Sequence, residues 1–125
     1  MTDECIFCGK ISEKKFLFEN NFWVALEDGF PVSKGHTLVI PKRHVASFFD
    51  LREEEFSSLK EMLNRVKERL DATYKPDGYN IGVNVGETAG QSVFHVHVHV
   101  IPRYVGDVAN PRGGVRGVIP SKQNY

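Results

Sequence analysis

The sequence predicts an α+β fold, in which an antiparallel meander of five strands carries one long helix on one face. Two periodicities support this prediction. Residues 95–100 alternate between histidine and valine, which is typical of a half-buried strand, because successive side chains point to opposite faces. Between residues 56 and 70, apolar side chains recur at spacings of three and four, which is the period of an amphipathic helix. Three short strands are expected before that helix and two after it.

The first third of the chain is expected to hold a short helical knuckle followed by three strands. The expected ranges are 5–10 for the knuckle and 16–19, 22–27 and 36–40 for the strands. Asn20 and Asn21 form a turn signal, so the first two strands are predicted to make a hairpin. Pro41 closes the third strand, because proline has no amide hydrogen for a sheet ladder.

The predicted helix runs from about Asp50 to Tyr74. Asp50-Leu51-Arg52-Glu53 has the form of a capping box, in which side chains satisfy free amides of the first turn. The apolar stripe that should face the sheet consists of Phe56, Leu59, Leu63, Val66 and Leu70. The charged face opposite is expected to be a solvated surface. Residues 79–85 are predicted to form the fourth strand, and the histidine-valine stretch forms the fifth.

Length and composition limit the classes of protein. A chain of 125 residues that is 41% hydrophobic is expected to form a single domain over residues 1–125. Sixteen basic residues balance sixteen acidic ones, which disfavours nucleic acid and anionic membranes as partners. The sequence has no apolar run of bilayer-spanning length and no apparent signal peptide, so a cytoplasmic location is expected. In such a reducing compartment, Cys5 and Cys8 are either redox-active or half of a metal site.

The histidine-valine stretch places three histidines on one face of its strand. His95, His97 and His99 alternate with valines that should face the core. Neighbouring histidines are roughly 6.6 Å apart along an ideal strand, and the outer pair roughly 13 Å apart. Two of them can converge on one metal, but the third hardly can, so a division of labour is expected. An expression tag or a solvated strand is disfavoured, because the motif is internal and follows the small polar segment 89–92.

These residues resemble the signature of the histidine-triad (HIT) nucleotide hydrolases and transferases. The motif His95-Val96-His97-Val98-His99-Val100 follows Gln91-Ser92-Val93, and an upstream run from Gly35 to His44 resembles the family's second block. The resemblance covers roughly residues 5–103 and implies a HIT-like fold, with a less regular tail from about residue 104. Family members are usually homodimers whose sheets join across the subunits.

The resemblance assigns roles to individual residues. It implies that His97 is the nucleophile, which becomes covalently nucleotidylated; neutral imidazole is suited to this role near pH 7. The implied phosphate donors and contacts are His99, His36, Asn84, Gln91 and Ser92. Asp28 matches the ribose-binding position, although a simple turn aspartate is the alternative. Phe22 and Leu26 are candidates for the base pocket, with the hydrophobic core as the other interpretation.

Cys5, Cys8, His44 and His95 offer two thiolates and two imidazoles, the complement of a closed tetrahedral zinc site. Their spacing is not that of a nucleic-acid zinc finger. The resemblance to zinc-containing members of the superfamily implies that this set binds structural zinc, which would make His95 a ligand instead of a proton donor. The alternatives are a surface histidine at position 44 and a pair of reduced thiols.

The tail is rich in glycine, proline and arginine and shows no periodicity. Arg112, Arg116 and Lys122 are candidates to contact the distal phosphates of a substrate, since guanidinium is a bidentate partner of phosphate. A flexible, solvated tail is the alternative. The segment Pro102-Arg103 followed by Gly106-Asp107 resembles the dinucleoside polyphosphate hydrolases more than the phosphoramidases.

The function predicted from these features is hydrolysis of dinucleoside polyphosphates at an α-phosphate through a His97-nucleotidyl intermediate. A nucleoside phosphoramidase, an adenylyl-sulfate hydrolase or a phosphorylase with the same site remains open. From other classes, a nucleotide-binding signalling module and a zinc-binding interaction protein also remain open.

Overall fold

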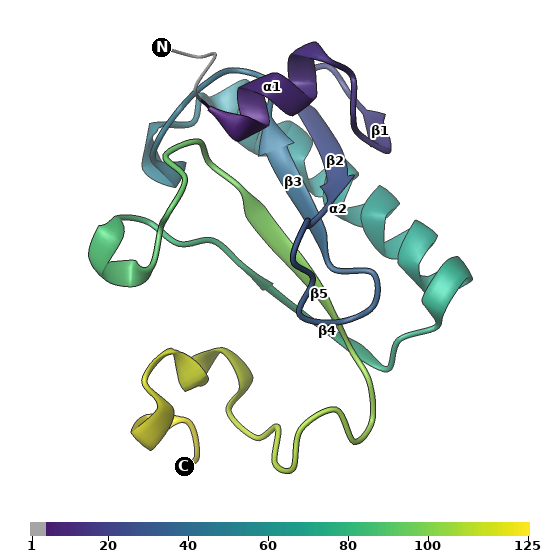
Figure 1. Cartoon of the computed structure of the whole chain (residues 1–125), viewed down its shortest axis with the longest axis vertical. Helices are drawn as coiled ribbons and strands as arrows, with labels where there is room; N and C mark the ends of the chain where they lie inside the picture. Colours follow the sequence, from purple (N-terminus) through teal and green to yellow (C-terminus); the bar gives the residue numbers. More distant parts are fainter. Residues whose placement is uncertain (1–4) are drawn as a thin grey trace.

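A five-stranded antiparallel sheet with helix α2 across one face dominates the computed structural model, which describes residues 5–125 (Figure 1). The strands are β1 (Phe18–Glu19), β2 (Trp23–Glu27), β3 (Thr37–Pro41), β4 (Gly78–Gly82) and β5 (Val98–Arg103). Their order in the sheet is β1-β2-β3-β5-β4. The predicted α+β class and five strands are confirmed, but the last two strands depart from a simple meander. The long helical connection carries the chain past β3, and β5 then fills the position between β3 and β4.

The histidine-valine stretch enters the sheet later than predicted. β5 begins at Val98, so His95 and His97 lie in the segment that leads into it. The Val96 amide donates to the carbonyl of Val45, 2.8 Å away, in the loop after β3 instead of to a neighbouring strand. The prediction that the valines face the core is confirmed, since Val96, Val98 and Val100 are all buried.

Helix α2 (Glu53–Tyr74) begins at a different cap from the one predicted. Residues Phe48–Asp50 form a short 3-10 helix, which removes Asp50 from the helix start. The Arg52 amide instead donates to Glu55 Oε1 at 2.7 Å, so the reciprocal cap lies two residues later. The predicted capping box at Asp50 is therefore wrong.

The buried stripe of α2 also differs from the predicted one. Leu59, Met62, Val66 and Leu70 are buried against the sheet, whereas Phe56 is 56% exposed. Phe56 packs edge-to-face on Phe48, with ring centroids 5.7 Å apart. The three-four spacing predicted the helix correctly, but the first apolar side chain of α2 that is buried against the sheet is Leu59 and not Phe56.

The sheet has a hydrophobic cluster on each face. The cluster under α2 contains Trp23, Ala25, Val39, Leu59, Met62, Val66, Leu70, Val98 and Val100. The second cluster contains Phe7, Val24, Leu26, Leu38 and Ile40. Phe7 comes from α1 (Ile6–Ser12), the predicted knuckle, which covers this second face near β2 and β3 (Figure 1). Because both faces are covered, almost every residue of β2 and β3 is buried.

A buried ion pair joins the segment after β3 to the start of α2. Glu55, whose side chain is 3% exposed, accepts hydrogen bonds from Arg43 Nε at 3.1 Å and Nη2 at 2.7 Å. The hydrogen bond from Arg43 holds the pKa of the Glu55 carboxyl below its ordinary value. A depressed pKa contributes stability that is present above the unfolded-state pKa and is lost as the pH falls through the folded-state value.

Replacing Glu55 with glutamine is expected to lower the free energy of unfolding by about 2 kcal/mol at pH 7, less than for a fully buried pair because Arg43 is partly exposed. The difference from the unmodified protein should shrink as the pH falls below about 4, where the carboxylate is protonated. Urea unfolding across this pH range measures it. The control is Glu68→Gln on the exposed face of the same helix, and equal losses in the two variants would contradict the expectation.

Gly35, which precedes β3, is required by both its conformation and its surroundings. Its φ is +88°, and an added Cβ would lie 2.9 Å from side-chain atoms of Leu70 and Tyr74. Gly35→Ala is therefore expected to destabilise the protein by about 2–4 kcal/mol, through left-handed strain and crowding. Gly29→Ala is the matched control, because its added Cβ meets nothing within 4 Å. Thermal melts compare the two, and equal melting temperatures would contradict the prediction.

The tail forms two short 3-10 helices, Gly114–Val118 and Pro120–Lys122, beyond the β4 edge of the sheet (Figure 1). It is mostly exposed and lacks α-helix or strand, as expected from its composition. Within residues 5–125, no helix is both long enough and apolar enough to cross a bilayer.

Candidate functional site

His97 is oriented by the backbone of His95, two residues earlier in the chain. Its Nδ1 donates to the carbonyl oxygen of His95 at 2.9 Å, because a carbonyl can only accept. In the neutral ring, Nε2 therefore carries the lone pair. Phe7 packs against this ring, with centroids 5.0 Å apart. Nε2 of His97 has no hydrogen-bond partner within residues 5–125, yet it is not among the fully buried atoms that lack one; in that part of the chain only an Arg69 nitrogen is. Nε2 of His97 therefore keeps contact with solvent.

His99 and His36 form a pair beside His97. His36 Nε2 lies 2.9 Å from His99 Nδ1, and the His99 and His97 ring centroids are 5.2 Å apart. Burial lowers the pKa of His36 and of His99 below the ordinary value, since desolvation disfavours the charged ring. Both rings are therefore neutral at pH 7. His36 is 3% exposed, so His99 is the more accessible of the two.

Asp28 approaches the same pair from the end of β2. Its Oδ2 lies 3.4 Å from His36 Nε2. Its Oδ1 accepts from the Phe30 amide at 2.7 Å, which is the turn geometry named as the alternative to ribose binding. One oxygen is thus occupied by the turn, while the other faces the histidines.

A cavity of about 480 Å³ opens beside these histidines. His36, His99 and Asn84 line one part of it, and the tail residues Val115 and Val118 line another. The structure therefore brings three of the predicted site residues to one cavity, and the tail borders it. His97 is not among the lining residues, but its ring lies next to that of His99, which also contacts His36.

Gln91 and Ser92 differ in how free their side chains are. Gln91 is 4% exposed, and its Nε2 donates to the carbonyls of Ala46 at 2.7 Å and Val93 at 3.1 Å, while its Oε1 accepts from the Gly86 amide at 2.9 Å. Both amide hydrogens of Gln91 are thus used in hydrogen bonds to loop carbonyls. Donation from this side chain to a phosphate would require one of these hydrogen bonds to break. Ser92 is exposed and remains a candidate contact.

The two base-pocket candidates lie on opposite faces of the sheet. Phe22 packs against the cluster under α2, whereas Leu26 belongs to the cluster with Phe7. Leu26 also borders a cavity of about 330 Å³, together with Phe16 and Lys10. Because the sheet separates them, Phe22 and Leu26 cannot line one pocket.

The two tail arginines, Arg112 and Arg116, both lie over the ring of Tyr125 at the C-terminus. The guanidinium carbons of Arg112 and Arg116 lie 5.3 Å and 4.5 Å from the ring centroid of Tyr125. Neither residue lines the cavity beside His99, and neither does Lys122. Their predicted contact with distal phosphates therefore stays a prediction.

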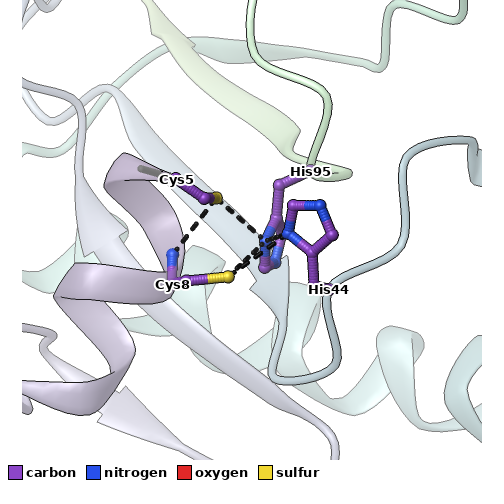
Figure 2. A group of neighbouring side chains, drawn as sticks. All are labelled: Cys5, Cys8, His44 and His95. Carbon is purple, nitrogen blue, oxygen red and sulfur yellow. Dashed lines mark hydrogen bonds between the residues drawn. The ribbon is translucent and has the colours of Figure 1, made fainter. Parts of the chain in front are cut away.

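The predicted metal ligands meet between α1, the segment after β3 and the segment before β5 (Figure 2). His95 Nδ1 lies 3.5 Å from Cys5 Sγ, 3.5 Å from Cys8 Sγ and 3.2 Å from His44 Nδ1. Cys8 Sγ is 3.2 Å from His44 Nδ1. Zinc bonds of about 2.3 Å to sulfur and 2.0–2.1 Å to nitrogen separate tetrahedral ligands by roughly 3.3–3.8 Å, so the four atoms fit one zinc ion.

The surroundings of these ligands also suit zinc. His95 Nε2 donates to the Pro41 carbonyl at 2.8 Å, which leaves the Nδ1 lone pair directed at the cluster, as is usual for metal-bound histidine. Burial and the neighbouring Cys5 thiol raise the pKa of Cys8 to about 11. Metal binding would therefore release a proton from this thiol.

Three features of the site were not predicted from the sequence. The Phe7 ring against His97, the Pro41 carbonyl behind His95 and a Val32 amide on His36 all come from the fold. Phe7 stands between the two cysteines, and that position is the one signal the sequence offered. Backbone groups carry no signal in the side-chain pattern.

Comparison with known proteins gives concordant matches. The HIT domain model matches residues 10–106. An uncharacterised HIT-like protein of Mycoplasma genitalium is 41% identical over 107 residues, which cover 82% of this chain and 75% of that protein. The bis(5'-adenosyl)-triphosphatase of Dictyostelium discoideum is 37% identical over 100 residues, which cover 80% of this chain and 67% of that enzyme.

Among solved structures, a zinc-bound histidine triad family protein from Mycobacterium smegmatis has a TM-score of 0.78 at 32% identity. The match covers 88% of this chain and 82% of that protein. A HIT family protein from Bacillus anthracis also has a TM-score of 0.78, at 39% identity, over 86% of this chain and 78% of that one. Both likenesses agree with the fold described above.

Proposed function

Because this chain belongs to the histidine-triad (HIT) family of nucleotide-processing proteins, we propose that it hydrolyses dinucleoside polyphosphates at an α-phosphate. The observation that carries the proposal is the arrangement of His97, whose Nδ1 is bound to a carbonyl and whose Nε2 is free. That nitrogen is a nucleophile of the kind that attacks phosphorus and forms a covalent intermediate. The named triphosphatase relative supports the substrate class.

The proposed reaction has two steps. His97 Nε2 attacks the α-phosphorus, a P–N bond forms, and the P–O bond to the leaving nucleotide breaks, so the leaving nucleotide departs as a phosphate anion. An N–H of neutral His99 donates a hydrogen bond to a phosphate oxygen during this step. Water then attacks the same phosphorus, the P–N bond breaks, and a nucleoside monophosphate is released. The proton of this water passes to the solvent, and His97 regains its Nε2 lone pair when the P–N bond breaks.

Other residues have positioning roles in this proposal. Asp28 accepts from the ribose hydroxyls through Oδ2, the oxygen that the turn leaves available. Asn84 lines the cavity beside His99, and Ser92 is exposed next to the histidine segment, so both are proposed as phosphate contacts. His36 supports His99 from behind.

We further propose that the Cys5, Cys8, His44 and His95 cluster holds a structural zinc ion. The donor set and spacing support this, as does the zinc-bound relative. Zinc would fasten α1 to the segment before β5, and it leaves His97 to act as the nucleophile. Free thiols in this cluster are in keeping with the predicted cytoplasmic location, which is reducing.

A homodimer is also proposed. β4 is the outer strand of the sheet, and within residues 5–125 no strand pairs with its outer edge, so that edge can pair with a second copy beside the tail. Ile81 on this strand is 50% exposed, which supplies an apolar contact. Pairing there would place the cavity beside His99 close to the subunit interface.

Product analysis tests the proposed reaction. The protein is incubated with diadenosine triphosphate, diadenosine tetraphosphate and an adenosine phosphoramidate, in ¹⁸O-labelled water, with and without inorganic phosphate. We expect adenosine monophosphate carrying the label on its phosphate, formed from the dinucleotides at a rate independent of added phosphate. Preferred cleavage of the phosphoramidate, or nucleoside diphosphate formed only with added phosphate, would contradict the proposal.

A further inference from the structure

We propose that the backbone amide of Val32 selects the tautomer of His99, with His36 as the link between them. The loop before β3 would thus orient the N–H group of His99 through a backbone amide, while the Val32 side chain lines the cavity beside His99. The importance of this series of hydrogen bonds for catalysis rests on the proposed function. The tautomers themselves can be measured without any substrate.

The first link is the hydrogen bond from Val32 to His36. The Val32 amide donates to His36 Nδ1 at 3.1 Å. An amide nitrogen cannot accept, so Nδ1 must carry a lone pair. His36 is buried, and burial favours its neutral form by lowering its pKa. The one ring proton of His36 therefore lies on Nε2.

The second link is the contact between His36 and His99. His36 Nε2 lies 2.9 Å from His99 Nδ1 and 3.4 Å from Asp28 Oδ2, so His99 is the nearer acceptor. With the proton on His36, Nδ1 of His99 must accept. The proton of neutral His99 is then on Nε2, which makes that nitrogen the donor available to a phosphate oxygen or leaving group.

The opposite arrangement is disfavoured by the same amide. If His99 donated from Nδ1 to His36 Nε2, the His36 proton would move to Nδ1 and face the Val32 N–H. Two donors would then oppose each other in a buried position. A buried donor left unsatisfied shifts such an equilibrium by about tenfold or more. The opposite arrangement would also leave His99 Nε2 as an acceptor, which cannot donate a hydrogen bond to a phosphate oxygen.

The Val32 amide also affects the metal preferences of the site. Asp28, His36 and His99 bring three possible ligand atoms within 4.8 Å of one another. Zinc on His36 Nε2 would need the lone pair there and the proton on Nδ1, opposite the Val32 amide. His95 differs, because its outer nitrogen donates to a carbonyl. The tautomer chain therefore predicts that zinc selects the cysteine cluster and leaves this triplet free.

The loop that carries Val32 is fastened independently of its side chain. Ser33 Oγ donates to the Pro102 carbonyl at 2.7 Å, and the His36 amide donates to the Ser33 carbonyl at 3.1 Å. The Val32 side chain itself is 70% exposed. Val32→Pro removes the amide hydrogen, and Val32→Ala keeps it, so these variants form a matched pair.

Long-range ¹H–¹⁵N spectra of the histidine rings in the zinc-bound protein test the proposal, because they distinguish Nδ1–H from Nε2–H in each ring. The unmodified protein and Val32→Ala should show Nε2–H on both His36 and His99. Val32→Pro should show a mixture, with at least about a tenfold gain in His99 Nδ1–H relative to Nε2–H. An Nδ1–H tautomer of His99 in the unmodified protein overturns the proposal, as does an unchanged Val32→Pro spectrum.

His36→Phe provides a second test if Val32→Pro does not fold. This variant keeps a ring but removes the donor, so His99 should again show both tautomers; a His99 that stays wholly Nε2–H would overturn the proposal. Zinc titration should give one zinc per chain in the unmodified protein, and a second zinc that depends on Asp28 and His36 would likewise overturn it. The predicted tautomers without nucleotide turnover would contradict the proposed function and support this inference.

Discussion

Replacement of His97 with asparagine is expected to lower the turnover of diadenosine polyphosphates by about 10⁴-fold or more, the scale on which removal of a nucleophile acts. In the unmodified protein, His97 Nδ1 donates to the His95 carbonyl oxygen 2.9 Å away. The amide nitrogen of an asparagine at position 97 can still donate to that oxygen. The fold and nucleotide binding should therefore persist while turnover is lost. Binding of adenosine monophosphate by calorimetry and steady-state turnover are measured separately.

Mass spectrometry provides a direct check on the same prediction. Rapid quenching of the unmodified protein with substrate should trap an acid-labile nucleotidyl adduct on His97, and the asparagine variant should form none. Lys60→Gln, on the exposed face of α2, is the control for an unrelated substitution. If the asparagine variant kept its turnover, or carried the adduct on another residue, His97 would not be the nucleophile.

Removal of zinc is expected to cause the largest loss of stability. An ion that binds only the folded state, at a free concentration 1,000 times its dissociation constant, stabilises that state by about 4 kcal/mol. For a chain of this length the melting temperature should fall by roughly 12–20 °C. The protein should nevertheless fold at low temperature without zinc, because two hydrophobic clusters stabilise the sheet independently. Calorimetry with and without a chelator measures the change.

Cys8→Ser is the matched substitution, since it removes one ligand and keeps the size of the side chain. It should lower the melting temperature in zinc to nearly that of the chelated protein, and a chelator should then have little further effect. Ser12→Ala, at the other end of α1, should keep one zinc per chain. A melting temperature that does not respond to the chelator would show that the cluster is a pair of reduced thiols beside two histidines.

The elements of the fold could be predicted because burial imposes two simple periods on the sequence. Alternation identified the valines of β5, and the three-four spacing identified Leu59, Val66 and Leu70 on α2. Phe56 matched the same spacing yet is exposed, and in that first turn of the helix the adjacent Glu55 is the buried residue. The order of β4 and β5 could not be predicted, since strand patterns do not specify neighbours.

The candidate site could be predicted to the extent that it depends on side-chain chemistry. The structure separates the histidines, with His95 beside the cysteines and His97 against Phe7, while the expected division of labour among them stays a prediction. Gln91 shows the limit of such reasoning. Its predicted phosphate contact stays a prediction, whereas the hydrogen bonds of its amide to two loops had no signal in the sequence. Which hydrogen bonds an amide makes depends on the loops around it, and the sequence does not give their paths.

One residue connects the proposed zinc cluster with His97, the proposed nucleophile. The ring of His95 faces the cysteines, while its carbonyl oxygen receives the proton of His97 Nδ1. Any shift of His95 on loss of the ion would reach the nucleophile across a single peptide segment, without passing through the hydrophobic clusters. A chelating compound should therefore lower the proposed hydrolysis at temperatures well below those at which it unfolds the protein.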